Sequence, residues 1–338
     1  MSITRVAQAA KVSYATAWRI INNQPCSSEQ AVAAVREAMG QLGYEPANGK
    51  RRGRRSKEAD GIRTHNVALL HLRQGTSIAT SVLSLVQRSL GERNLNLIFA
   101  HGSGESALPQ AVRTGNVDGI LGYGQFPVEA MTPELQRIPA VWMMSRDDTN
   151  LDPWGDRVKT DHQVIGQLAA QYLMQRGHRN LAFLNPDSQF TIFQQRLGSF
   201  AAATMAAGVT PQVFESAGTR DLEIEGERLV EQWLAATPRP TGIFVPVDRV
   251  TLHVHRQLER RGIQVGKDVE IVSCDNEREL LSLMRPAPAS IDLNRHTIAR
   301  LAVERLLWRM KNGVNSPRVV ITVTPTLVTQ GVTAKEQM

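Results

Sequence analysis

The feature that most restricts the fold is a repeated alternation of strand-like and helix-like segments after residue 66. Short apolar runs typical of buried strands are separated by longer runs with helical spacing, for example at residues 78–91. The predicted strands occupy residues 67–72, 95–100, 119–121 and 140–144, and then 180–184, 212–214, 242–245 and 270–273. This alternation predicts two lobes, each a doubly wound parallel sheet with helices on both faces. Ligands of such folds bind beyond the carboxyl ends of the strands, so we expect a site between the lobes.

Residues 3–21 show a different pattern, in which two short helices are separated by a brief turn. The second helix has an N-cap residue before it, an inward apolar stripe and an outward face. The outward face carries Tyr14, Ala15, Trp18 and Arg19. Two helices this close must cross steeply, which predicts a helix-turn-helix unit. A third helix, opened by a capping box of Ser27 and Gln30, completes the core. The alternative is a three-helix packing module in which Arg19 is only a solvated charge.

Positive charge is concentrated near the N-terminus. Residues 1–64 contain 11 Lys or Arg against 5 Asp or Glu, which accounts for +6 of the total net charge of +7. Such asymmetry favours one polyanion-binding module joined to a nearly neutral body.

Residues 1–46 resemble the DNA-binding domain of the LacI/GalR family of bacterial transcription regulators. The resemblance is carried by Val6 and Ala7, by the string 12–20, by Asn22, and by residues 39–46. It implies an all-α helix-turn-helix domain whose second helix lies in the major groove of DNA.

The resemblance also assigns roles within that helix. It implies that Tyr14, Ala15 and Arg19 face the bases, and that Ser13, Thr16 and Asn22 hold phosphates or the turn. Arg19 can donate to guanine O6 and N7 together, which contributes about 1–3 kcal/mol of base discrimination.

Three residues depart from the family pattern. Ala15 stands where a hydrogen-bonding side chain is common, which reduces readout there to contact with a thymine methyl group. Trp18 replaces a small residue and must either stack on sugar or base or disturb the usual docking. Lys11 stands where the family usually has glycine, in a turn that prefers positive φ.

Residues 47–65 form a basic linker. The candidate DNA-binding residues in it are Lys50, Arg51, Arg52, Arg54 and Arg55. In the family this region is a hinge helix whose leucine wedges into the minor groove, and this chain lacks that leucine. Three forms stay open: a hinge helix, an extended arm in a narrow A·T-rich minor groove, and a disordered linker that adds affinity by counterion release.

The resemblance continues through residues 66–338, most clearly at 117–120, 176–179 and 239–244. It implies a two-lobed, periplasmic-binding-protein-like effector-binding and dimerisation domain. The expected lobes are about 66–161 plus 292–322, and about 162–291 plus 323–338.

Effector-binding positions follow from the same resemblance. Arg196 matches the family's cleft arginine, Asp275 the carboxylate after a strand, and Asp248 the acid that opens a helix. Arg73 and Ser77 lie in a loop that departs from the usual sequence. Carboxylates accept from hydroxyls and Arg donates in a fixed fork, so we expect a small polar, sugar-like effector. For each of the three charged cleft residues, a structural role as a cap or ion-pair partner is the alternative.

The sequence lacks the motifs of several other classes. It contains no dinucleotide fingerprint, Walker loop, nucleophile elbow or His-Glu-x-x-His motif, and Asp161-His162 reads as a helix cap rather than an acid/base pair. Cys26 and Cys274 are isolated, as expected in a reducing compartment. No membrane-spanning run or signal peptide is apparent. We therefore expect a cytoplasmic protein that is not an enzyme and uses no metal or cofactor.

These observations predict a dimeric, effector-responsive transcription regulator, and the resemblance implies a repressor. One recognition helix covers only a few base pairs, so two-fold pairing on a palindromic operator is expected. Three alternatives remain: an effector-independent regulator, a nonspecific DNA-binding protein acting through residues 50–57, and a cytoplasmic sugar-binding protein.

Overall fold

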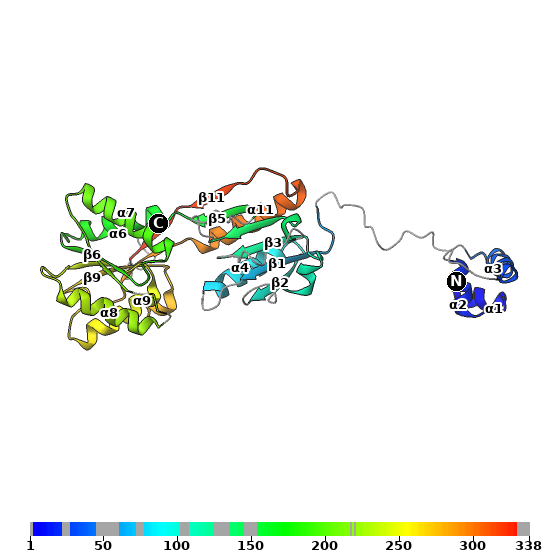
Figure 1. The fold of residues 1–338 in the computed structure, drawn as a ribbon, viewed down its shortest axis with the longest axis horizontal. Coiled ribbons are helices and arrows are strands. Elements are labelled where there is room, and N and C mark those ends of the chain that lie inside the picture. Colours follow the sequence, from blue (N-terminus) through cyan, green and yellow to red (C-terminus); the bar gives the residue numbers. More distant parts are fainter. Residues whose placement is uncertain are drawn as a thin grey trace. The chain divides into compact units, whose positions relative to one another are not determined.

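The computed structural model describes residues 3–21, 28–44, 61–71, 78–101, 108–124, 135–144, 154–216, 218–219 and 221–329. Its contacts divide the chain into two units, Met1–Glu58 and Ala59–Met338. The described part of the first unit is helical, and the second unit is α/β (Figure 1).

The first unit has a small core shared by its helices. The described helices are α1 (Ile3–Ala9), α2 (Tyr14–Ile21) and α3 (Glu29–Gln41). Each contributes one fully buried side chain to a common cluster, namely Val6, Ala17 and Val35. Because these side chains fall on the inward stripes that the spacing predicts, the three-helix arrangement follows from local sequence.

Two local features set the helix boundaries in this unit. Lys11, in the turn between α1 and α2, has a φ of 52°, the positive value for which the family usually has glycine. The N-cap of α3 is Ser28, whose Oγ accepts from the Ala31 backbone N–H at 3.2 Å. The prediction that Ser27 opens this helix was therefore wrong by one residue, because adjacent serines offer the same capping chemistry.

The second unit begins with a six-stranded sheet in which every pair of neighbouring strands is parallel. The order is β11-β5-β4-β3-β1-β2. The strands are β1 (Asn66–His71), β2 (Asn96–His101), β3 (Gly119–Tyr123), β4 (Ala140–Met143), β5 (Asp156–Thr160) and β11 (Val320–Val323).

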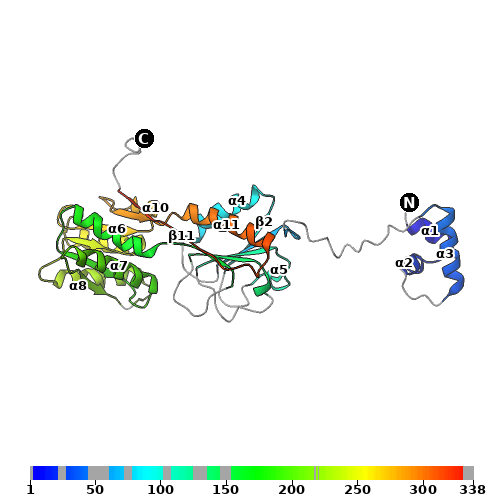
Figure 2. The same cartoon turned by 90° about the horizontal axis from the view of Figure 1, so that it is seen from above.

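Helices cover both faces of this first sheet. Helices α4 (Ile78–Gly91) and α11 (Arg295–Asn312) pack on one face, and α5 (Gln110–Arg113) packs on the other (Figure 2). The 3-10 helix η3 (Leu135–Arg137) packs on the same face as α5. Successive side chains of a strand point to opposite faces, so the unbroken apolar run of β1 supplies both cores.

The second sheet has the same design with one exception. Its order is β12-β10-β9-β8-β6-β7, and β12 alone runs antiparallel to its neighbour. The strands are β6 (Leu181–Asn185), β7 (Gln212–Glu215), β8 (Gly242–Phe244), β9 (Glu270–Cys274), β10 (Ala289–Asp292) and β12 (Thr326–Val328). The predicted fold class, an all-α N-terminal domain plus two doubly wound parallel sheets, is confirmed apart from this edge strand.

Helices again lie on both faces of the second sheet. Helices α6 (His162–Gln175) and α7 (Thr191–Ala206) bury one face, and α8 (Leu222–Ala235) and α9 (Asp248–Arg260) bury the other. The short helix α10 (Arg278–Leu281) follows β9.

The chain passes between the sheets after β5, after β10 and after β11. At the first crossing Asp161 caps α6, since its carboxylate accepts from the backbone N–H groups of Gln163 and Val164. The cap role expected for Asp161 is thus confirmed. The other two crossings are joined by a hydrogen bond of 2.6 Å from Asn294 Nδ2 to the Thr324 carbonyl oxygen.

Candidate functional site

Helix α2 presents an exposed face with a composition suited to base contact. Ala17 and Ile20 are buried, whereas Tyr14 and Trp18 are 55% and 42% exposed. Ala15 and Arg19 are exposed as well. The predicted division of this helix into an inward and an outward face therefore holds in the structure.

The start of α2 is fixed by its own side chains. Ser13 Oγ accepts from the Thr16 backbone N–H at 3.1 Å, and the two hydroxyl oxygens lie 2.9 Å apart. This satisfies one of the backbone donors that a helix N-terminus leaves free. Several predicted site residues lie outside the described residues, namely Asn22, Lys50, Arg51, Arg52, Arg54, Arg55, Arg73 and Ser77.

A buried cluster of opposite charges lies at the carboxyl edge of the second sheet. Arg196, on α7, places Nη2 3.8 Å from Oδ1 of Asp275, which directly follows β9. Arg295, the first residue of α11, places Nη2 3.5 Å from the same oxygen and donates from Nη1 to the Asp275 carbonyl oxygen at 2.7 Å. Burial raises the pKa of Asp275, and the charges of Arg295 and Arg196 oppose that rise. The structure thus brings together two of the predicted effector residues.

Arg295 was not predicted. Arg295 begins a helix that the sequence pattern did not identify. The one feature that could have indicated it is its position three residues after the end of β10, because ligand-binding groups of parallel sheets lie beyond the strand ends.

Two further properties distinguish the surroundings of Asp275. Its φ is 112°, a conformation that costs a non-glycine residue on the order of 1–3 kcal/mol and that clusters at functional sites. Buried polar atoms with no hydrogen-bond partner among the described residues also gather around it. They include Nε of Arg196, Nε and Nη2 of Arg295, and Oδ1 of Asn276. Since most buried polar atoms are hydrogen-bonded, these atoms are suited to a bound polar ligand.

Asp248 has a different environment. It is fully buried, and its carboxylate accepts from the hydroxyls of Ser273 and Ser290 and from the Glu277 backbone N–H. Burial, followed by the charge of Asp275, raises the pKa of Asp248 to about 7. Both carboxylate oxygens are engaged within the protein, which fits the structural alternative for this residue.

Aromatic and imidazole side chains line the carboxyl edge of the first sheet. His71 and His101, the last residues of β1 and β2, have their Nδ1 atoms 3.0 Å apart, and Tyr123 at the end of β3 meets His71 edge-on. Burial raises the pKa of Tyr123, and the charges of Arg295 and Asp275 also act on it. The first sheet therefore turns this edge toward the Asp275 cluster. The sequence did not identify these three residues, because strand ends alone do not single out their side chains.

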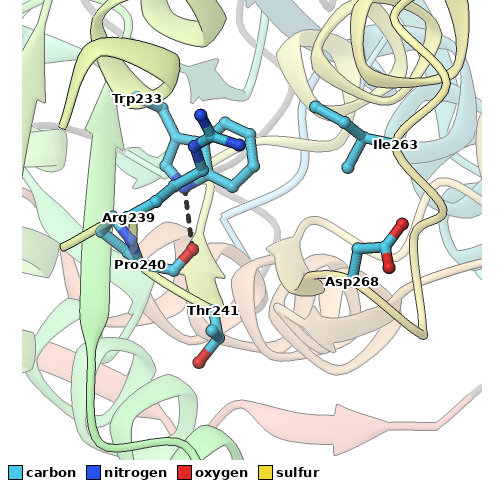
Figure 3. A pocket seen from close by; sticks show the side chains of 6 residues that line it. All are labelled: Trp233, Arg239, Pro240, Thr241, Ile263 and Asp268. Atoms are coloured by element: carbon cyan, nitrogen blue, oxygen red, sulfur yellow. Dashed lines mark hydrogen bonds between the residues drawn. The ribbon is translucent and has the colours of Figure 1, made fainter. Parts of the chain in front are cut away.

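A pocket of about 390 Å³ lies elsewhere, at the amino ends of β8 and β9 (Figure 3). It is lined by Trp233, Arg239, Pro240, Thr241, Ile263 and Asp268. Arg239 lies over the Trp233 ring at 5.2 Å, and Trp233 Nε1 donates to the Pro240 carbonyl oxygen. Because it lies at the opposite edge of the sheet from Asp275, this pocket is separate from the predicted effector site.

Comparison with known proteins gives matches in both units. Residues 2–47 match the family model "Bacterial regulatory proteins, lacI family", and residues 170–333 match "Periplasmic binding protein-like domain". No described helix is both long and apolar enough to cross a membrane.

Curated relatives match nearly the whole chain. The ribose operon repressor of Escherichia coli (strain K12) is 27% identical over 311 residues, covering 90% of this chain and 92% of the relative. Catabolite control protein A of Priestia megaterium is 29% identical over 324 residues, covering 92% and 93%. Among solved structures, the Lac repressor dimer bound to operator and an anti-inducer shares the fold with a TM-score of 0.63 at 19% identity, covering 97% and 98%. The chain therefore combines a LacI-family helix-turn-helix domain with a periplasmic-binding-protein-like domain, and the relatives it matches along most of its length are transcription regulators.

Proposed function

We propose that this protein is a repressor that binds a palindromic operator as a homodimer and responds to a small hydroxylated metabolite. The observation that carries the DNA-binding half is the exposed face of α2, with Arg19 between apolar side chains on a helix matched by the lacI family model. One such helix reads only a few base pairs, so a dimer is needed for two half-sites. The Lac repressor relative is itself a dimer on operator.

Residues 47–65 add the electrostatic part of this binding. Six Lys or Arg lie within residues 50–57, and phosphate contacts release counterions whether or not the segment is ordered. Because the proposed operator is cytoplasmic DNA, we place the protein in the cytoplasm.

Asp275, Arg196 and Arg295 form the proposed effector site. In the described part of the chain, Arg196 and Arg295 have N–H donors without a hydrogen-bond partner, and the backbone of Asp275 is strained. These features, at the carboxyl edge of a parallel sheet, support a ligand rich in hydroxyl oxygens. The relatives include a repressor named for ribose. Asp248 supports this site indirectly: its carboxylate accepts from the Glu277 backbone N–H and so holds the loop that follows β9 and contains Asp275.

Ligand and DNA binding are coupled through the crossings between the lobes. Arg295 lies at one crossing, and Asn294 ties that crossing to Thr324 at another. A ligand that changes the distance between the lobes therefore acts on both crossings at once, and linkage requires DNA to alter ligand affinity by the same factor.

The test uses the full chain in two steps. Selection from random DNA should enrich a palindrome bound at least about 10³-fold more tightly than unrelated DNA at physiological salt. Calorimetry with sugars, sugar phosphates and nucleosides should then find a ligand that changes affinity for that palindrome. Absence of an enriched sequence would favour the nonspecific DNA-binding alternative, and a palindrome without any responding ligand would favour the effector-independent regulator.

A further inference from the structure

The exposed face of α2 has little hydrogen-bonding capacity. The hydroxyls of Ser13 and Thr16 are directed to each other, and Ser13 also caps the helix. The exposed side chains beyond them are Tyr14, Ala15, Trp18 and Arg19. A face of this composition offers one forked donor, the Arg19 guanidinium, and two single hydrogen-bonding groups, the Tyr14 hydroxyl and the Trp18 indole N–H. The rest of its surface is apolar.

Trp18 supplies most of that apolar surface. It is 42% exposed and lies one helical turn after Tyr14 and Ala15, so the three side chains form a continuous stripe. In the major groove, the apolar feature of the base edges is the C5 methyl group of thymine. We take DNA to be the occupant of this stripe because the helix lies in the lacI family match and within residues 1–64, which carry +6 of the total net charge of +7.

We infer that Trp18 and Ala15 read thymine methyl groups, so that each operator half-site contains thymines beside the guanine contacted by Arg19. This inference rests on the proposed entry of α2 into the major groove. At these positions the protein would recognise a base by apolar contact with its methyl group, where a polar side chain would recognise it by hydrogen bonds. In the competing arrangement, Trp18 contacts the sugar–phosphate backbone. DNA affinity would then not depend on the C5 methyl group of thymine.

Deoxyuridine substitution tests the inference directly. Uracil keeps the hydrogen bonds of thymine and lacks only the C5 methyl group. Each thymine of the selected half-site is replaced in turn, and binding of the full chain is measured. At two thymines or more we expect affinity to fall about four-fold per methyl group removed, the factor that corresponds to one buried methylene.

Variants locate the contact. In Trp18→Ser, the penalty for uracil at one of those thymines should disappear, as a double-mutant cycle requires for a direct contact. Trp18→Phe keeps an apolar ring and should keep the penalty, which guards against a folding defect in the serine variant. Trp308→Ser is the matched control, since Trp308 on α11 is also 42% exposed, and it should leave every penalty unchanged.

The outcomes separate this inference from the proposed function. Suppose that selection enriches a palindrome but uracil lowers affinity at no thymine; methyl reading is then wrong while operator binding stands. If uracil lowers the affinity of Trp18→Ser as much as that of the wild type at every thymine, methyl reading by Trp18 is wrong. If selection enriches no sequence, the proposed function itself fails, and the inference fails with it.

Discussion

Arg196 and Asp275 form a buried ion pair, with 3.8 Å between Nη2 and Oδ1, although they come from a helix and a loop that are distant in sequence. Arg295 approaches the same carboxylate oxygen. Several N–H donors of these two buried guanidinium groups have no hydrogen-bond partner among the described residues. These donors are the groups that the proposed effector site offers to the oxygen atoms of a polar ligand.

The first prediction concerns the response to effector. Asp275→Asn or Arg196→Ala should lower effector affinity about ten-fold or more, because each leaves a buried polar partner unpaired at a cost of about 1–3 kcal/mol. Operator affinity without effector should stay within about two-fold, a small effect beside those costs. Calorimetry and operator titration measure the two quantities.

Arg300→Ala is the control for that experiment, because Arg300 is an exposed residue of α11 that pairs only with Glu304 among the described residues. If the Asp275 and Arg196 variants bound effector normally and differed from the wild type only in thermal stability, the pair would be structural.

The second prediction concerns pH. The pKa of Asp248 is raised to about 7 from its ordinary 3.8, so the folded chain holds a proton that the unfolded chain releases. Its contribution to stability is therefore complete below about pH 4 and is lost as the pH rises through about 7. Between pH 5 and 7, wild type should lose stability relative to Asp248→Asn, and the difference should level off above about pH 8. Urea unfolding at each pH measures it. A difference that does not change with pH would show that Asp248 stays ionised in the folded protein.

A third prediction concerns the buried start of β5. Asp156 accepts from Arg305 and Arg309 on α11 and from the Val319 backbone N–H, and it joins two distant segments to the strand. Asp156→Ala leaves Arg309 buried without its acid, so unfolding should become easier by about 3–5 kcal/mol. Glu304→Gln removes only an exposed pair and should change stability by about 0.5 kcal/mol or less. Equal midpoints of urea unfolding for the two variants would refute this reading.

The same strand shows why the sequence predicted the fold only in part. Helix 78–91 was predicted with the bounds that the structure has, because its apolar spacing is decided locally. Strand β5 was missed, since the charged residues of Asp156–Thr160 read as surface. Asp156, the first of them, is buried against Arg305 and Arg309 of α11, more than 140 residues later in the chain. A local pattern contains no information about such a partner.

The candidate site was predicted to a similar extent. The family resemblance indicated Arg196 and Asp275, and the structure brings these two residues together. It also indicated Asp248, whose two carboxylate oxygens accept hydrogen bonds from other groups of the protein. Arg295 and the His71–His101 pair were missed because they become neighbours only when the strand ends converge.

The fourth prediction concerns the basic linker. Changing Arg51, Arg52, Arg54 and Arg55 to Gln should flatten the salt dependence of operator binding by about 0.9 in log–log slope for each phosphate that is no longer neutralised. Arg260→Gln, an exposed residue of α9, should leave the slope unchanged. If the variant with all four substitutions kept the wild-type slope, this segment would not contact DNA. Operators with A·T-rich and G·C-rich centres then separate a minor-groove arm from a nonspecific linker.

The most direct test of sequence-specific binding through α2 is the ratio of operator affinity to random-DNA affinity in Arg19→Ala, measured by competition at physiological salt. Removing the forked hydrogen bond to guanine should lower that ratio about 10- to 100-fold, since such a bond contributes about 1–3 kcal/mol of discrimination. Arg36→Ala, an exposed residue of α3, should keep the wild-type ratio. An unchanged ratio in a folded Arg19→Ala protein would contradict the assignment of α2 as the recognition helix.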